Sequence, residues 1–238
     1  LLAVGVTLLA WYVTSLSQRN AATRSFEEQA LRVEQQIYER MRGYEQVLRS
    51  GAALFAASPE ISRQEWVRYV EGSRLQDIYP GVQGLHFAAR VADADLAGHL
   101  AKMRRETVAG YAVRPPGVRP EYYPVVWPAP VNERNLRAQG FDLAAEPVRR
   151  EAMARARDTG LPALSGKVAL IGDLANPVPG FVYFQAIYAR GQPLATTEER
   201  RRAIIGFVFC PFRVADLMQG VIGRGGVGVG AGGVRGAA

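Results

Sequence analysis

Apolar residues recur every three or four positions between Phe26 and Phe55, which is the period of an amphipathic α-helix. They occupy positions 26, 30, 33, 37, 41, 44, 48, 51, 52 and 55, and charged residues fill the other faces. The pattern predicts a helix on the order of 45 Å long. Its apolar stripe must be covered by the rest of the domain, by a second copy of the chain, or by both. We predict a stalk helix over residues 18–58, with an ordinary core helix as the alternative.

The chain before this helix is apolar from residue 1 to residue 16, apart from two threonines and a serine. A helix needs about 20 apolar residues to span a bilayer. The segment therefore predicts an N-terminally truncated transmembrane helix over residues 1–17, in contact with the lipid bilayer through residues 1–16. A cleaved signal peptide ending near Ser15-Leu16-Ser17 is the alternative. The helical period that continues directly after this segment favours the anchor.

Beyond the break at Ser58-Pro59, helical and strand patterns alternate without βαβ regularity, which predicts the α+β class. Ser62 and Glu65 have the spacing of a capping box and predict the start of a helix that ends near Ser73. Strands are expected at 84–91, 168–171, 181–188 and 203–210, with a polar hairpin loop at 189–202. The glycine-rich tail, 221–238, has the low complexity of a disordered segment.

The segment from Tyr122 to Ser165 has the pattern of a strand, a polar loop, a helix and a second strand. Pro147 suits the first helical turn, and Gly160 suits a left-handed cap at the end of the helix. Aromatic residues and sparse polar groups are typical of a small-molecule pocket, although an ordinary aromatic core has the same composition. A one-residue slip of the last strand would exchange Phe181 and Tyr183 for Val182 and Phe184. The predicted ligand-binding residues are Tyr122, Trp127, Asn132, Asp142, Ser165, Phe181 and Tyr183.

Several motifs in this region follow one another in the order of a known family: Glu121–Val126, Gly140–Leu143, Arg155–Gly160, Leu164–Gly166, Gly180–Val182 and Gly206–Val208. From about residue 60 to about residue 220 the chain resembles the CHASE domain. This domain is the extracytoplasmic sensor of bacterial receptor kinases and cyclases and of plant cytokinin receptors. The resemblance implies a stalk helix that carries two PAS-like sheets in tandem, of which the distal one holds the ligand. It assigns residues 59–220 to the sensor domain.

The resemblance also implies a role and a location. The chain would be the ligand-sensing input module of a receptor in the cell inner membrane, with its sensor on the periplasmic or extracellular side. The full-length protein would be a histidine kinase or a diguanylate cyclase or phosphodiesterase. Separately, the apolar stripe from Phe26 to Phe55 exceeds what one small domain needs to cover, which predicts a homodimer through the stalk helix. A spacer that dimerises without a ligand is the alternative. The plant receptors carry an aspartate after the Tyr-x-Pro-Val strand, and the corresponding run here, 128–132, has no acid. We therefore expect no tight binding of cytokinins.

Composition and motifs argue against other functions. The formal charge is +7, with 29 Lys and Arg against 22 Asp and Glu, but the arginines are scattered and no nucleic-acid motif accompanies them. We therefore predict no nucleic-acid partner. Cys210 lies in an apolar run and is expected to be a buried, inert thiol. His86 and His99 lack the carboxylate spacing of a metal site, and His86 is expected at the surface. Gly228, Gly230 and Gly233 match the dinucleotide-binding fingerprint by accident of a glycine run, because the sequence predicts no strand before them and no helix after them. The sequence has no catalytic motif, so we predict neither enzymatic activity nor a cofactor for this chain.

Overall fold

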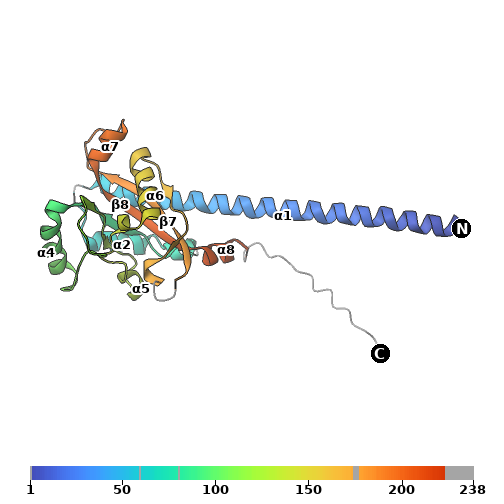
Figure 1. Cartoon of the computed structure of the whole chain (residues 1–238), viewed down its shortest axis with the longest axis horizontal. Helices are drawn as coiled ribbons and strands as arrows, with labels where there is room; N and C mark the ends of the chain where they lie inside the picture. The colour runs from blue at the N-terminus through green and yellow to red at the C-terminus, as the bar shows by residue number, and fades with distance from the viewer. Residues whose placement is uncertain (1, 59, 80, 174–176, 223–238) are drawn as a thin grey trace, which may run out of the picture. The chain divides into compact units, whose positions relative to one another are not determined.

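The computed structural model describes residues 2–58, 60–79, 81–173 and 177–222 (Figure 1). Most of the glycine-rich tail that we predicted to be disordered lies outside these residues. The chain divides into two compact units, residues 1–42 with 221–238, and residues 43–220.

The first unit contains the beginning of helix α1, which runs from Leu2 to Ala57 (Figure 1). The helix predicted from the apolar period between positions 26 and 55 is confirmed, and α1 extends beyond that range at both ends. Phe26, Leu31 and Tyr38 expose 72%, 64% and 60% of their surface. A large apolar surface of α1 is therefore open to solvent or to another molecule.

No helix in the described part of the chain is both long enough and apolar enough to cross a lipid bilayer. The transmembrane helix predicted over residues 1–17 is therefore not seen in the structure.

The second unit is built on a six-stranded antiparallel sheet whose two long strands, β7 and β8, pair along almost their whole length. The strand order is β4 (Val125–Trp127), β1 (His86–Ala89), β8 (Ile204–Arg213), β7 (Pro179–Tyr188) and β5 (Ala163–Leu164), and β6 (Val168–Ala169) also pairs with β7. A separate two-stranded sheet joins β2 (Val91–Ala92) to β3 (Glu121–Tyr122). The two sheets are thus very unequal in size. The α+β class is confirmed.

The two faces of the large sheet are covered by different helices. Side chains alternate between the faces of a strand, so Val182 and Phe184 of β7 face the core under α6 (Pro147–Thr159). Tyr183, on the opposite face, reaches Glu45 in the last turns of α1. At Gly51 of α1 an added Cβ would lie only 3.1 Å from both Leu85 and Val208. A glycine at this position therefore lets α1 approach the sheet closely.

Shorter helices complete the second unit. Ser62 and Glu65 form the predicted capping box at the start of α2 (Arg63–Gly72), and Ser73 caps its end. The remaining helices are α3 (Leu75–Ile78), η1 (Asp93–Asp95), α4 (Leu96–Glu106), α5 (Glu133–Leu136), η2 (Leu143–Ala145), η3 (Ile171–Asp173), α7 (Thr197–Ala203) and α8 (Val214–Ile222).

The prediction of a polar hairpin loop over residues 189–202 was wrong, because the second half of this segment forms α7. Thr196 accepts a hydrogen bond from the backbone N–H of Glu199, and the carboxylate of Glu199 accepts one from the backbone N–H of Thr196. This reciprocal pair is a second capping box and stabilises the first turn of a short helix.

Candidate ligand-binding site

A small cavity of about 30 Å³ lies between the sheet and the segments that cover its α6 side. Strands β1, β7 and β8, helices α5 and α6 and the short helix η3 all contribute to its wall. The apolar part of the wall consists of Ala138, Leu143, Leu170, Ile171, Val182 and Phe209. The polar part consists of Gln83, His86, Arg134, Asn135 and Arg149. An enclosed apolar cavity with a few converging polar groups is the usual form of a small-molecule site.

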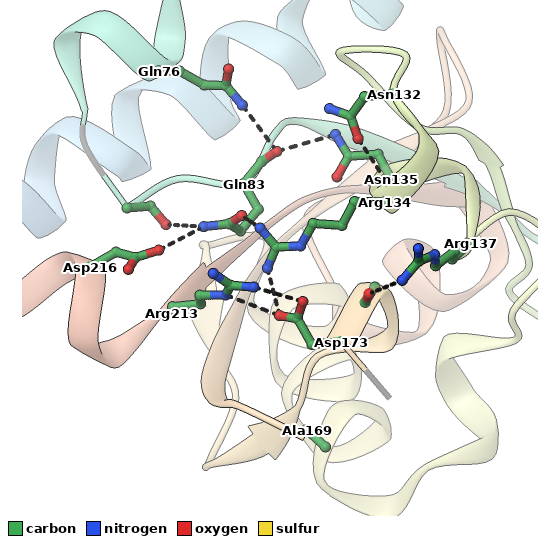
Figure 2. Close-up of polar contacts among 12 residues, drawn as sticks. Gln76, Gln83, Asn132, Arg134, Asn135, Arg137, Ala169, Asp173, Arg213 and Asp216 are labelled. Carbon is green, nitrogen blue, oxygen red and sulfur yellow. Dashed lines mark hydrogen bonds and ion pairs between the residues drawn. The ribbon is translucent and has the colours of Figure 1, made fainter. Parts of the chain in front are cut away.

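A network of charged residues holds one edge of this cavity (Figure 2). Asp173 accepts hydrogen bonds from Nε and Nη2 of Arg213, at 3.0 and 2.7 Å, and one from Nη2 of Arg134 at 2.5 Å. Burial raises the pKa of Asp173, but the hydrogen bonds from Arg213 and Arg134 outweigh it and the pKa is lowered. Asp173 is therefore an ionised anchor that orients two arginines.

Gln83 and Asn135 connect this network to α5. Nη1 of Arg134 donates to the side-chain oxygen of Gln83 (Figure 2). The buried amide of Asn135 donates to the backbone oxygens of Pro130 and Gln83, at 2.9 and 3.2 Å. Asn132 is exposed instead and caps α5, because its side-chain oxygen accepts from the backbone N–H of Asn135 at 2.9 Å. The asparagine that lines the cavity is thus Asn135.

Arg149 is the most unusual residue of the wall, since its side chain is only 4% exposed. Nη2 donates to the backbone oxygen of Ala169, Nη1 lies 3.5 Å from a carboxylate oxygen of Glu146, and the guanidinium lies 5.7 Å from the ring centre of Phe141. Nε is buried and has no hydrogen-bond partner within the described part of the chain. Burial lowers the pKa of Arg149 and Glu146 opposes that change. Since an arginine stays protonated, Arg149 gives the cavity wall a buried positive charge with one unpaired donor, Nε–H, among the described residues.

The prediction that His86 lies at the surface was wrong, because only 2% of its surface is exposed. Its Nδ1 accepts a hydrogen bond from the backbone N–H of Ala129 at 3.1 Å, so Nε2 carries the proton of the neutral ring. Burial lowers the pKa of His86 to about 3. The strand face opposite Phe87 is therefore interior, since α5 and α6 cover it, and alternation alone could not reveal that cover.

The seven predicted ligand-binding residues are dispersed over the second unit. The hydroxyl of Tyr122 donates to the side chain of Asp93 and lies 3.0 Å from it. Trp127 stacks against Phe55 of α1, and its backbone oxygen accepts from the indole of Trp66. Phe181 packs beside Phe212, and Tyr183 bonds to Glu45, both on the α1 side of the sheet.

Asp142 and Ser165 are buried and serve local backbone groups. Asp142 accepts from the backbone N–H groups of Tyr123 and Ala144, at 2.8 and 3.2 Å. Ser165 accepts from the backbone N–H of Val182 at 2.9 Å and donates to the oxygen of Gly166. None of the seven, all of them described residues, lines the cavity. Leu143, next to Asp142 in the chain, and Val182, between Phe181 and Tyr183, do line the cavity.

The sequence signal that marks Arg149 and Arg134 is weak, because both belong to runs of polar residues in short helices. Their burial follows from tertiary packing. In the described part of the chain, no group of three or more His, Cys, Asp or Glu residues could hold a metal ion. Cys210 is buried as predicted, and burial raises the pKa of its thiol.

Comparison with known proteins supports a sensory role for this chain. The CHASE domain model matches residues 59–229. A hybrid signal transduction histidine kinase A from Dictyostelium discoideum is 25% identical over an alignment of 244 residues, which covers 92% of this chain. The chain spans 11% of that relative's own length. CHASE domains are extracytoplasmic sensors of small ligands. Because the model matches well over half of the sequence and includes every residue that lines the cavity, the chain belongs to the CHASE domain family.

Proposed function

We propose that this chain is the ligand-sensing input module of a membrane-bound signalling receptor, and that a small molecule binds in the cavity of the large sheet. The observation that carries the proposal is the cavity itself, whose wall contains a buried arginine with an unpaired Nε–H. A protein selected only for stability would gain by pairing or removing that charge. A sensor retains such a group when a ligand satisfies it.

Strand β7 offers a route from the cavity to α1. Val182 lines the cavity, and the next residue, Tyr183, lies on the opposite face, where its hydroxyl bonds to Glu45 of α1. A ligand that shifts β7 would therefore also shift the hydrogen-bond partner of α1. Within residues 43–220, this is a direct mechanical connection between the binding site and the helix that leaves the domain.

The output domain that we propose is a histidine kinase, because the relative from Dictyostelium discoideum carries that description. We further propose that residues 1–17 attach the receptor to the membrane and that α1 pairs with its copy in a homodimer. The exposed apolar side chains of α1, among them Phe26, support pairing. In a membrane, two tethered copies would meet at a high effective concentration.

A ligand screen on the full chain tests the sensing role. Metabolite mixtures are added to the purified protein and the melting temperature is measured. A ligand present at about 100 times its dissociation constant should add roughly 2.7 kcal/mol to the unfolding free energy. Hydrogen exchange should then slow at residues 141–145, 168–173 and 180–186, the segments that contain the wall residues Leu143, Leu170, Ile171 and Val182.

A ligand-free spacer is the second candidate function, and the small cavity volume favours it. The cavity of about 30 Å³ is far below the roughly 300–1,000 Å³ of drug-sized sites. Sensing therefore requires a small ligand, or opening of the Arg134 edge. If no compound raises the melting temperature or slows exchange at the cavity, the spacer is correct and the sensing proposal is wrong.

A further inference from the structure

We propose that the cavity binds a small monocarboxylate, whose carboxylate group pairs with the guanidinium of Arg149. The inference rests on the proposed sensing function and names the chemical class of its ligand. Three observations carry it: the unsatisfied donor of Arg149, the absence of acids from the described wall, and the balance of charges just outside that wall.

The first observation concerns hydrogen bonds. A guanidinium has five N–H donors in a planar fork that matches a carboxylate. In Arg149, Nη2 is engaged by Ala169 and Nη1 has only a long contact with Glu146, while Nε is buried and unpaired within the described residues. A carboxylate placed against Nε completes this set. A neutral carbonyl would make one weaker bond.

The second observation concerns the wall. Two arginines and no Asp or Glu line the cavity among the described residues. His86 adds a donor in place of an acceptor, because its Nδ1 is occupied by the N–H of Ala129 and its proton is on Nε2. The charged side chains of the described wall are therefore cationic only, which favours an anionic ligand with acceptor oxygens.

The third observation limits the ligand to one negative charge. Arg134 and Arg213 already share the carboxylate of Asp173, and Glu146 lies 3.5 Å from Arg149. These acids neutralise most of the local positive charge, so a phosphate or a dicarboxylate would bring more negative charge than the site can balance. The cavity volume of about 30 Å³ exceeds the roughly 10–15 Å³ that one water needs, which suits a head group as compact as a carboxylate.

The remaining wall suits an apolar body on that ligand. Leu143, Leu170, Ile171, Val182 and Phe209 surround the cavity. An aliphatic or aromatic tail would displace the Arg134 edge, where the wall is held by hydrogen bonds between side chains rather than by the sheet. We therefore expect affinity to rise from acetate to propionate to benzoate, because each adds apolar surface to bury.

Calorimetric titration of the full chain with acetate, propionate and benzoate tests the proposal, at constant ionic strength set with sodium chloride. Acetamide, propionamide and benzamide are the uncharged controls of the same shape. We expect benzoate to bind at least tenfold more tightly than benzamide. Arg149→Met should weaken benzoate about 100-fold, since it removes one partner of a buried charge pair. Arg149→Lys should restore only part of the affinity, because it keeps the charge and loses the fork.

Arg150→Met is the matched control. Arg150 follows Arg149 in α6, is exposed, and donates to the backbone oxygen of Ala144 away from the cavity. The substitution Arg150→Met should leave the affinity for benzoate unchanged. Equal loss in both variants would overturn the proposal, as would equal binding of acids and amides. If an uncharged metabolite protects the cavity from hydrogen exchange while no carboxylate binds, this inference is wrong and the sensing function stands. If no compound of any class binds, both are wrong.

Discussion

Two basic side chains of the cavity wall, Arg149 and His86, are buried, and they differ in charge. His86 is neutral, because burial lowers its pKa to about 3. Its Nδ1 accepts a hydrogen bond from a backbone N–H. Arg149 cannot give up its proton under ordinary conditions. Its charge is only partly compensated by Glu146, at 3.5 Å. We therefore interpret His86 as a structural residue. Arg149 lacks a full set of hydrogen-bond partners among the described residues, and we infer that a ligand supplies the missing one.

This difference predicts the effect of Arg149→Met on stability. Replacing an incompletely paired buried charge by an apolar side chain of similar length is often neutral or stabilising. We expect the unfolding free energy of the ligand-free chain to change by less than about 1 kcal/mol, as measured by urea denaturation. Leu143→Ala, in the same wall and fully buried, should lose about 2–5 kcal/mol. A loss of that size in Arg149→Met would instead make Arg149 a structural residue.

A second prediction at this scale concerns Asp158, which ties α6 to α7. Its carboxylate accepts from Nε and Nη2 of Arg201, at 3.0 and 2.7 Å, and from Nε of Arg157 at 2.7 Å. The hydrogen bond from Arg201 is the largest influence; it and Arg157 lower the pKa of Asp158 well below its ordinary value of 3.8, against the opposing effect of burial. The folded chain thus holds the proton less strongly than the unfolded chain. The stabilisation is complete above about pH 4 and is lost as the pH falls below it.

Asp158→Asn should therefore lose about 0.5–1 kcal/mol at neutral pH and a smaller amount at pH 2, measured by thermal unfolding at both values. Glu133→Gln, which breaks the exposed ion pair with Arg137, is the matched control. It should change the stability little. An equal loss for Asp158→Asn at both pH values would show that the ion pairs are not its cause.

Helix α6 is the element that brings Arg149 under the sheet, and its ends define its position. Glu146 caps the first turn by accepting from the N–H groups of Val148 and Arg149. Gly160 ends the helix with a φ of 74°, and its N–H donates to the oxygen of Ala156. A left-handed residue at this position allows the chain to turn toward β5, which pairs with β7.

Two glycine substitutions should therefore have opposite effects on stability. Gly160→Ala forces alanine into a left-handed conformation and should cost about 1–2 kcal/mol. Gly98→Ala lies in an exposed turn of α4 where no atom lies within 4 Å of the added Cβ. It should gain about 0.5–1 kcal/mol by restricting the unfolded chain. Thermal unfolding of both variants checks the pair, and changes of the same sign would contradict the argument.

The same elements explain what could be predicted from the sequence. The start of α2 at Ser62, the start of α6 at Pro147 and its end at Gly160 follow from local backbone chemistry, and all three are confirmed. The start of α7 had an equally local signal, the capping box of Thr196 and Glu199, within a segment read as a loop.

The cavity wall had no such signal. Strand alternation separates Val182 from Tyr183, but it does not identify which face α6 will cover. The burial of His86 and Arg149 likewise depends on residues distant in sequence. The sequence therefore predicted the segments that surround the site more accurately than the side chains that line it.

At the scale of the whole molecule, the exposed apolar surface of α1 predicts self-association. The positions of Phe26 and Ile37 differ by 11 residues, which is close to three turns, so both lie on one side of the helix. The full chain should sediment as a dimer at high micromolar concentration. The double substitution Phe26→Glu and Ile37→Glu should shift it to a monomer by placing charges in the contact. Gln35→Glu, on a polar face, is the control, and a monomeric unsubstituted chain would remove the proposed pairing.

The last prediction is that this chain does not bind cytokinins, although it belongs to the CHASE family. Adenine-type cytokinins present N–H donors, for which a carboxylate is the natural acceptor. No acid lines the described cavity wall, whereas two positively charged residues, Arg134 and Arg149, belong to it. Micromolar cytokinin should therefore leave the melting temperature of the full chain unchanged. Asn132→Asp, which restores an acid after the Tyr-x-Pro-Val strand, should not create binding either, because Asn132 is exposed and caps α5. A rise of several degrees in the unsubstituted chain would contradict the description of the site as cationic and free of acids in its described wall, and a rise only in Asn132→Asp would mean that the ligand enters next to α5, outside the cavity.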